Sequence, residues 1–338
     1  MSSNKLFFLS VFLSLVMVPK VFAHCGVCEV SSYSPERQKE SISSGAMLNS
    51  PTATTVGRSH VAAGFVFEYD RFNSIAPDTA HALHESGRDI HGKDYEEYYN
   101  MLLGYGLWDD LDIHLVAPIV SKTSLQIEDA GDDGAGIPGN LGRRETFSGF
   151  GDMRLLGKYR FWKKFVEAAL IAGIKFPTGT TSKKDKSGNK FEPEQAPGSG
   201  SWDGEFGLAL SRSFFHQLSF AQSFKYTLKG EGAQDRKSGD EFRYSLGTSY
   251  ALRKFGKYPN LSIVAELNNI WMLRDHSRKE DKVFDSGGTT IFVTPGLSAD
   301  ITRNISAFWA ISTPIYQNLG GEHEELKIRI LAGVNIHF

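Results

Sequence analysis

The strongest constraint on this fold lies in the last stretch of the chain, residues 326–338, where apolar and mostly polar side chains alternate. The apolar set is Leu326, Ile328, Ile330, Ala332, Val334, Ile336 and Phe338, and the set between them is Lys327, Arg329, Leu331, Gly333, Asn335 and His337. This period of two predicts a β-strand with one apolar face. A closed transmembrane barrel needs such strands, of roughly 9 to 11 residues, because their apolar face meets lipid. The alternative is the terminal strand of a soluble β-sandwich.

The same alternation recurs along the chain in paired runs, which are joined by tight connections and separated by longer polar ones. The predicted strands are 61–72, 97–108, 111–125, 152–162, 165–177, 202–214, 218–229, 241–253, 261–273, 289–302, 305–317 and 326–338. Bacterial outer-membrane barrels have an even strand number, short periplasmic turns and longer external loops. We therefore predict an all-β fold, a 12-stranded antiparallel transmembrane β-barrel at residues 59–338, in the outer membrane of a Gram-negative cell. Residues 131–149 are predicted as one of its long loops.

Prolines and aromatic residues qualify this prediction. Four prolines lie within or at the ends of the runs, where each lacks an amide proton for the strand ladder: Pro118, Pro177, Pro295 and Pro314. Because alternation continues around them, they affect the strand ends and not the pattern. Aromatic side chains gather toward strand ends, where the girdles of a barrel lie, although ordinary core packing explains them equally well. Examples are Tyr98, Tyr99, Trp108, Phe161, Trp162, Phe214, Phe215 and Trp271.

Composition agrees with many amphipathic strands joined by turns. The chain has 41% apolar and 12% aromatic residues, and its 34 glycines far outnumber its 2 cysteines. A formal net charge of -2 gives no indication of a nucleic-acid partner.

The first residues have the pattern of a secretory signal peptide. Lys5 precedes an apolar core at residues 6–18, and the small-residue site Val21-Phe22-Ala23 follows. We expect cleavage after Ala23, so that residues 1–23 are removed. Residues 24–58 lack strong periodicity and are rich in Ser, Thr and Gly, which predicts an irregular periplasmic arm or a plug in the barrel mouth.

Three runs of sequence resemble a known family. They are Gly-Phe-Gly-Asp-Met-Arg-Leu-Leu-Gly-Lys-Tyr at 149–159, Ala-Gly-Ile-Lys-Phe-Pro-Thr-Gly at 172–179 and Gly-Leu-Trp-Asp-Asp-Leu-Asp at 106–112. From about residue 60 onward the chain resembles the family named for the MetA pathway of phenol degradation, whose members are outer-membrane barrels described as transporters. The resemblance implies passage of small solutes, aromatic or hydrophobic ones among them. It does not extend to residues 24–58.

Charged side chains in the predicted strands face the lumen if faces are assigned by period two. The basic set is Arg154, Lys158, Arg160, Lys175, Lys225, Lys229, Arg243, Lys327 and Arg329, and the acidic set is Glu68, Asp112, Glu167, Asp203, Glu205 and Glu266. One interpretation is a mildly basic lumen that favours anionic or polar groups of a solute. The other is a set of cross-lumen ion pairs that hold a narrow barrel shut or dock the arm, because a buried charge needs a partner.

The sharpest local motif is His24-Cys25-Gly26-Val27-Cys28 in the arm. Two thiolates at this spacing, with the His24 imidazole or the new terminal amine, can bind a soft metal such as zinc or copper. A Cys25–Cys28 disulfide is the common alternative in an exported protein, and inert thiols are the third. The metal interpretation gives an alternative function, an outer-membrane protein that binds or delivers a soft metal ion.

Two further hypotheses concern a metal site and an enzyme. The predicted loop 73–95 contains His81, His84 and His91 among acidic residues, either a surface metal site or solvated loop residues. Outer-membrane phospholipases also have twelve strands, but their His-x-Ser arrangement is not found on a predicted strand here. The sequence offers no base within reach of a nucleophile, so we predict that the chain is not an enzyme.

We predict a channel or facilitated transporter for small solutes. Its expected partners are the lipid bilayer, the solute and, through the strand that ends in Phe338, the barrel-assembly machinery.

Overall fold

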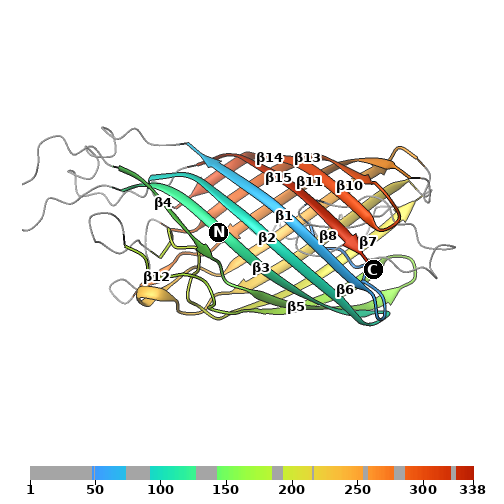
Figure 1. The fold of residues 1–338 in the computed structure, drawn as a ribbon, viewed down its shortest axis with the longest axis horizontal. Coiled ribbons are helices and arrows are strands. Elements are labelled where there is room, and N and C mark those ends of the chain that lie inside the picture. The colour runs from blue at the N-terminus through green and yellow to red at the C-terminus, as the bar shows by residue number, and fades with distance from the viewer. Residues whose placement is uncertain are drawn as a thin grey trace, which may run out of the picture.

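The fold was analysed in a computed structural model, which describes residues 48, 50–73, 92–126, 143–184, 193–214, 217–253, 258–277, 286–320 and 325–338. Its main element is a closed antiparallel barrel of tilted strands (Figure 1). The barrel strands are β1 (Val61–Phe72), β2 (Gly92–Trp108), β3 (Leu111–Gln126), β4 (Arg143–Phe150), β5 (Arg154–Lys163), β6 (Glu167–Lys175), β7 (Asp203–Phe214), β8 (Leu218–Leu228), β10 (Glu241–Ala251), β11 (Asn260–Met272), β13 (Gly288–Asp300), β14 (Ile305–Leu319) and β15 (Leu326–His337). The loops add the 3-10 helix η2 (Ala233–Asp235) and a two-residue pair, β9 (Arg236–Lys237) with β12 (His276–Ser277).

The barrel closes because β1 pairs with β15 on one side and with β2 on the other. Phe338 donates its amide proton to the Val61 carbonyl at 2.9 Å, so pairing continues to the last residue. Short connections lie at the end of the barrel where the chain terminates, and longer ones lie at the other (Figure 1). We call these the short-turn end and the long-loop end. The predicted 12-stranded barrel is confirmed, with strand ends within a few residues of those expected.

The prediction was wrong at residues 143–149, which were expected to belong to the loop at residues 131–149. Residues 143–150 form β4 and pair with residues 119–126 of β3, whereas β5 pairs with residues 111–116 of the same strand. The two short strands occupy one place in the barrel, and the break between them, at residues 151–153, lies opposite Pro118. Because Pro118 has no amide proton, it cannot donate a ladder hydrogen bond to the neighbouring strand. That strand is therefore interrupted at this position. Gly151 donates instead to the Pro118 carbonyl at 2.9 Å.

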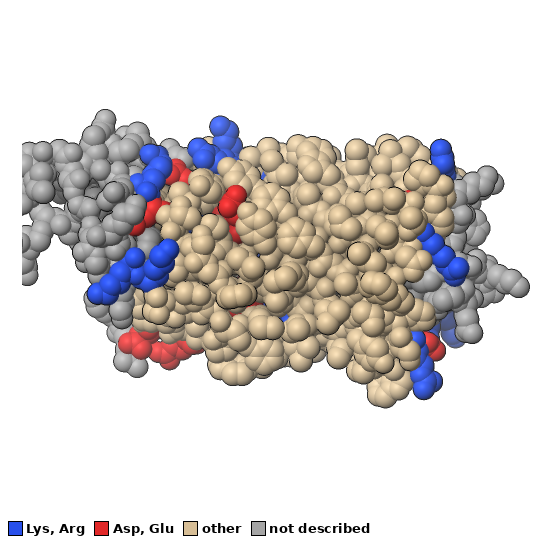
Figure 2. Space-filling view, in the orientation of Figure 1, with Lys and Arg blue, Asp and Glu red and all other residues tan. Residues whose placement is uncertain are grey.

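The outer face of the barrel is apolar. Large hydrophobic side chains on successive strands stand outward, among them Phe206, 55% exposed, and Trp309, 47% exposed. Figure 2 shows that on the viewed face Lys, Arg, Asp and Glu are concentrated toward the two ends, while other residues cover a broad central band. This band matches the apolar belt with which outer-membrane barrels contact lipid. In the described part of the chain, no helix has the length and apolar character to cross a membrane.

A pair of arginine substitutions measures the depth of this band. Leu246 lies in the middle of β10 and faces outward, and Leu252 lies just beyond the end of the same strand. We expect Leu246→Arg to lower the free energy of unfolding by about 2–4 kcal/mol and Leu252→Arg by about 0–1 kcal/mol, because the cost of arginine falls toward the interface. Chemical denaturation of the protein refolded in lipid vesicles gives both values. Equal losses at the two positions would contradict a lipid-facing band at this height.

Candidate functional site

The candidate site is the interior of the barrel, where the amino-terminal segment lies against the strands. We define the inner arm as Leu48 with residues 50–58. Residues 50–57 and Leu48 are buried, and they enter from the short-turn end, where β1 begins. The Val56 amide donates to the Asp112 carboxylate at 2.7 Å, and the Ala53 amide donates to the Ser211 hydroxyl at 2.8 Å. The inner arm therefore contacts both β3 and β7.

The end of the inner arm at Leu48 and Ser50 is held by β11. The Glu266 carboxylate accepts the Leu48 amide proton and a hydrogen bond from the Ser50 hydroxyl at 3.2 Å. The same hydroxyl lies 3.3 Å from the Asn268 side-chain oxygen. Glu266 and Asn268 lie halfway along β11, so the arm reaches the middle of the barrel. Its buried amides thus receive the partners that buried polar groups require.

The other end of the inner arm, at Gly57, packs closely against Gly106 of β2. A Cβ placed on Gly106 would lie 1.7 Å from the Gly57 carbonyl oxygen, which leaves no space for any side chain. Gly57 has a φ of 89°, a left-handed value that favours glycine. The adjoining Ser59 amide donates to the Gly106 carbonyl at 2.8 Å. Gly106 and Asp112, which belong to one of the runs that resemble the family, therefore seat the arm.

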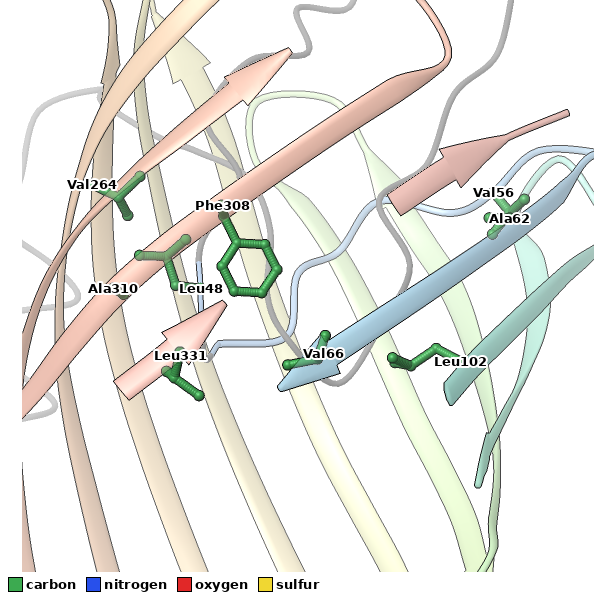
Figure 3. Packing of buried hydrophobic residues seen from close by; sticks show 9 residues of the cluster. All are labelled: Leu48, Val56, Ala62, Val66, Leu102, Val264, Phe308, Ala310 and Leu331. Carbon is green, nitrogen blue, oxygen red and sulfur yellow. The ribbon is translucent and has the colours of Figure 1, made fainter. Parts of the chain in front are cut away.

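An apolar cluster covers one side of the interior (Figure 3). It joins two residues of the inner arm to inward-facing residues of β1, β2, β11, β14 and β15. Its members are Leu48, Val56, Ala62, Val66, Leu102, Val264, Phe308, Ala310 and Leu331. Figure 3 shows Leu48 among Val264, Phe308, Ala310 and Leu331, with Val56 and Ala62 farther along the lumen. This part of the interior offers contact to apolar groups, in contrast to the charged remainder.

Ion pairs line the long-loop half of the lumen. Arg329 on β15 contacts Asp70 at 2.5 Å and Glu68 at 3.0 Å, both on the neighbouring strand β1. On β2, Glu96 accepts a 2.5 Å hydrogen bond from the Tyr98 hydroxyl, and it lies 3.8 Å from Lys122 of β3. The predicted girdle residue Tyr98 therefore faces inward, unlike Trp108 or Trp271, whose side chains are exposed.

The opposite wall holds a second group of ion pairs. Glu205 on β7 lies 2.7 Å from Lys225 and 3.5 Å from Arg154. Lys175 lies 2.8 Å from Asp203 and 3.0 Å from Asp152. Each carboxylate is taken out of water and needs such a cation to offset its desolvation. In both groups an acidic side chain is paired with a basic one of the barrel wall.

The loop between β6 and β7 folds into the long-loop end of the barrel. Ala196 packs on the inward-facing Phe147 of β4, and both are almost fully buried. The Asp152 carboxylate accepts hydrogen bonds from the Gly179 amide at 2.9 Å and from the Ser199 amide at 2.8 Å. This contact joins the two other runs that resemble the family. The loop therefore occupies part of the lumen at the long-loop end, whereas the inner arm enters at the short-turn end.

Glu194 connects this loop to three other parts of the mouth. Its backbone carbonyl accepts a 2.8 Å hydrogen bond from Lys122, and its carboxylate lies 3.9 Å from Lys93. Its carboxylate also pairs with Arg236, which in turn contacts Asp275 at 3.0 Å. The connections that follow β6, β8 and β11 are thereby joined across the long-loop end.

Arg160 and Glu167 lie near the short-turn end. Arg160 contacts Glu167 at 3.0 Å and Asp110 of the adjacent turn at 2.7 Å. Burial raises the pKa of the Asp110 carboxyl, but hydrogen bonds from Lys163 and Arg160 outweigh burial and hold that pKa below its ordinary value. The pair anchors a turn and does not point a free charge at a solute.

The remaining predicted site residues divide into several groups. Lys158 is buried and lies directly across the β3–β5 ladder from Asp112, and Arg243 pairs with Glu241. Lys229 lies 4.0 Å from Asp203. Lys327 is exposed, next to the irregularity in the β1–β15 register. The predicted ligands His24, Cys25 and Cys28, like His81, His84 and His91, lie outside the described residues. Within the described ranges, no group of three or more metal-ligating side chains comes together.

Sequence reasoning missed Ser211, Asn268 and Glu194 as residues of the interior. Each is a single polar residue whose partner is more than 40 positions away, so no local pattern identifies it. Asp112 was predicted to face the lumen, but its contact with the arm was not. The signal that could have indicated this contact is the absence of a side chain at Gly106 in the same hairpin, which lets another backbone approach.

The chain resembles known proteins in sequence and in fold. A family described as "Putative MetA-pathway of phenol degradation" matches residues 106–314. An outer-membrane channel from Pseudomonas putida F1 superposes with a TM-score of 0.58 at 14% identity, over 86% of this chain and 100% of that one. The CymD monoaromatic hydrocarbon channel superposes with a TM-score of 0.45 at 11% identity, over 83% of this chain and 88% of that one. No curated protein sequence matches the chain.

The seat of the inner arm can be tested with two glycine substitutions. Gly106→Ala places a methyl group on the Gly57 carbonyl, so we expect the arm to leave its seat while the barrel stays folded. Gly157→Ala is the control, because its added Cβ meets its nearest atom at 3.8 Å. Limited proteolysis of the folded barrel should cut the arm at least several-fold faster in Gly106→Ala only. Equal protection of the arm in both variants would show that the seat does not hold it.

Proposed function

The chain belongs to this phenol-degradation family, and from that premise we propose that it is an outer-membrane channel or facilitated transporter for small solutes, including aromatic and other hydrophobic ones. The single observation that carries the proposal is the apolar cluster within an ion-paired lumen. Channel selectivity depends on the groups that line the pore and on its width. An apolar wall favours solutes with an apolar body, and balanced ion pairs give little preference for either sign of charge.

We propose that the inner arm acts as a plug at the periplasmic side. Outer-membrane barrels turn their short connections to the periplasm, which places the entry of the arm on that side. The arm crosses from Asp112 on β3 to Glu266 on β11, and hydrogen bonds hold it at both points. We extend the same role to residues 24–47, which precede Leu48 in the chain.

This account does not require catalysis. Ser199 and Ser201 lie beside Lys175, an arrangement that could be mistaken for a nucleophile with its base. Lys175 lies between the carboxylates of Asp152 and Asp203, at 3.0 Å and 2.8 Å. The Ser199 hydroxyl donates to the Asp152 carboxylate at 2.7 Å, so we assign this cluster to holding the loop in place.

Bilayer measurements test the channel and the plug together. We expect the mature protein to give a small conductance in planar bilayers and slow solute-dependent swelling of liposomes. Deletion of residues 24–58 should raise both at least several-fold, because the segment that fills the lumen is removed. The control is a refolded sample of each protein whose barrel is verified by its β-sheet circular dichroism. If neither protein gave conductance or swelling, the proposed channel would be wrong. If both gave equal conductance, the proposed plug would be wrong.

We also infer that the strand ending in Phe338 is recognised by the barrel-assembly machinery. The Phe338 side chain is 69% exposed at the end of β15, where a partner can reach it before the barrel closes against β1. Deletion of Phe338 should lower the amount of folded protein in the outer membrane several-fold, and the matched substitution Phe338→Tyr should not. Unassisted refolding in detergent should be similar for the two. Normal membrane levels after the deletion would refute the inference.

A further inference from the structure

Leu48 lies in a hollow formed by small residues of adjacent strands. Val264, Gly296, Ala310 and Leu331 are successive partners across β11, β13, β14 and β15, and so they form one row of the inner wall. The two small residues stand between two branched ones. A Cβ added to Gly296 would lie 2.2 Å from the Leu48 Cδ1 atom and 2.8 Å from the Ala310 Cβ atom. The missing side chain at Gly296 therefore makes the space that Leu48 fills.

The hollow has an aromatic wall as well. The Phe308 ring lies over Gly333 of β15, where an added Cβ would be 2.5 Å from its Cε1 atom. Figure 3 shows the ring beside Leu48, Ala310 and Leu331. Leu48, Ala310 and Leu331 are fully buried, with 0% exposure. The space has apolar walls on several sides and holds the isobutyl group of Leu48.

A polar row borders the hollow on the side of the long loops. Glu266 on β11 pairs across the ladder with Thr294, whose hydroxyl lies 2.7 Å from that of Ser312. Glu266 accepts the Leu48 amide proton, and the Asn268 side chain donates to the same carboxylate at 3.3 Å. An acceptor of the Leu48 amide thus stands at the rim of an apolar space. Binding pockets for small molecules commonly combine apolar walls with a few placed polar groups.

Resting on the function proposed above, we propose that this hollow is a binding site for a small apolar molecule carrying one hydrogen-bond donor. In the structure, Leu48 presents an apolar side chain to the hollow and one donor, its backbone amide, to Glu266. A ring with a single hydroxyl or amine group presents the same two features. Leu48 is therefore an internal competitor, and a solute binds when it displaces the arm. A competitor that occupies the site lowers the apparent affinity in proportion to the fraction of protein whose site is free.

Binding of p-cresol to the full-length mature protein in detergent tests this proposal. Leu48→Ala should raise the affinity for p-cresol at least about tenfold, because the burial of a leucine side chain contributes about 1.5–3 kcal/mol and 1.4 kcal/mol is a factor of ten. Val56→Ala is the matched control, since it removes a branched arm residue from the same cluster but not from the hollow. Toluene, which has no donor, should bind the Leu48→Ala protein more weakly than p-cresol.

A second pair of variants fills the hollow itself. Gly296→Val in the Leu48→Ala background should abolish the gain in p-cresol binding, and Ala310→Leu should do the same from the adjacent strand. The two fillers guard against misfolding of either one, which circular dichroism of the barrel detects. No gain in p-cresol affinity in Leu48→Ala would overturn the proposal, as would a gain that survives both fillers.

Liposome swelling with arabinose separates this site from the channel. Swelling by all variants without any change in p-cresol binding would reject the site and leave the channel in place. A gain in binding for Leu48→Ala without swelling by any variant would support the site and reject the channel.

Discussion

The whole structure depends on the pairing of β1 with β15. In hydrocarbon there is no water to satisfy backbone amides and carbonyls, so a sheet that crosses a membrane must close on itself. The ladder from Ala62 to Phe72 supplies that closure and ends with the Phe338 amide on Val61. It also brings Arg329 beside Asp70 and Glu68, and Leu331 beside the other apolar residues of the lumen. Closure and the composition of the interior therefore arise from one register.

The interior is divided between two kinds of interaction. Ion pairs fix the long-loop half, where Arg329, Glu205 and Lys175 each have an opposite charge within 3.0 Å that offsets the cost of desolvation. The apolar cluster and the inner arm occupy the other part. There, Gly296 and Ala310 leave a space that branched residues surround. A charged mouth and an apolar wall favour a passage that selects by apolar surface. This division supports the proposed transport of small hydrophobic solutes.

Most of the barrel could be predicted from the sequence because period two is a local signal. The strands at residues 61–72 and 305–317 show it clearly, and the structure places strands there. β4 was missed because it lies next to a Gly- and Asp-rich segment and is interrupted opposite Pro118. The family resemblance rested on three runs that contain several glycines and aspartates. Their partners, Gly57 for Gly106 and Gly179 for Asp152, are distant in sequence, so their purpose required the three-dimensional structure.

The most direct test of the account locks the inner arm in place. Ala53 and Ser211 are adjacent across the lumen, with the Ala53 amide 2.8 Å from the Ser211 hydroxyl. Cysteines at both positions, in a protein whose Cys25 and Cys28 are replaced by serine, should form a disulfide that tethers the arm. Single-channel recording should show a low conductance in the oxidised protein that rises several-fold in the same channel when a reductant is added. An unchanged conductance on reduction would contradict the central claim that the arm controls passage through this barrel.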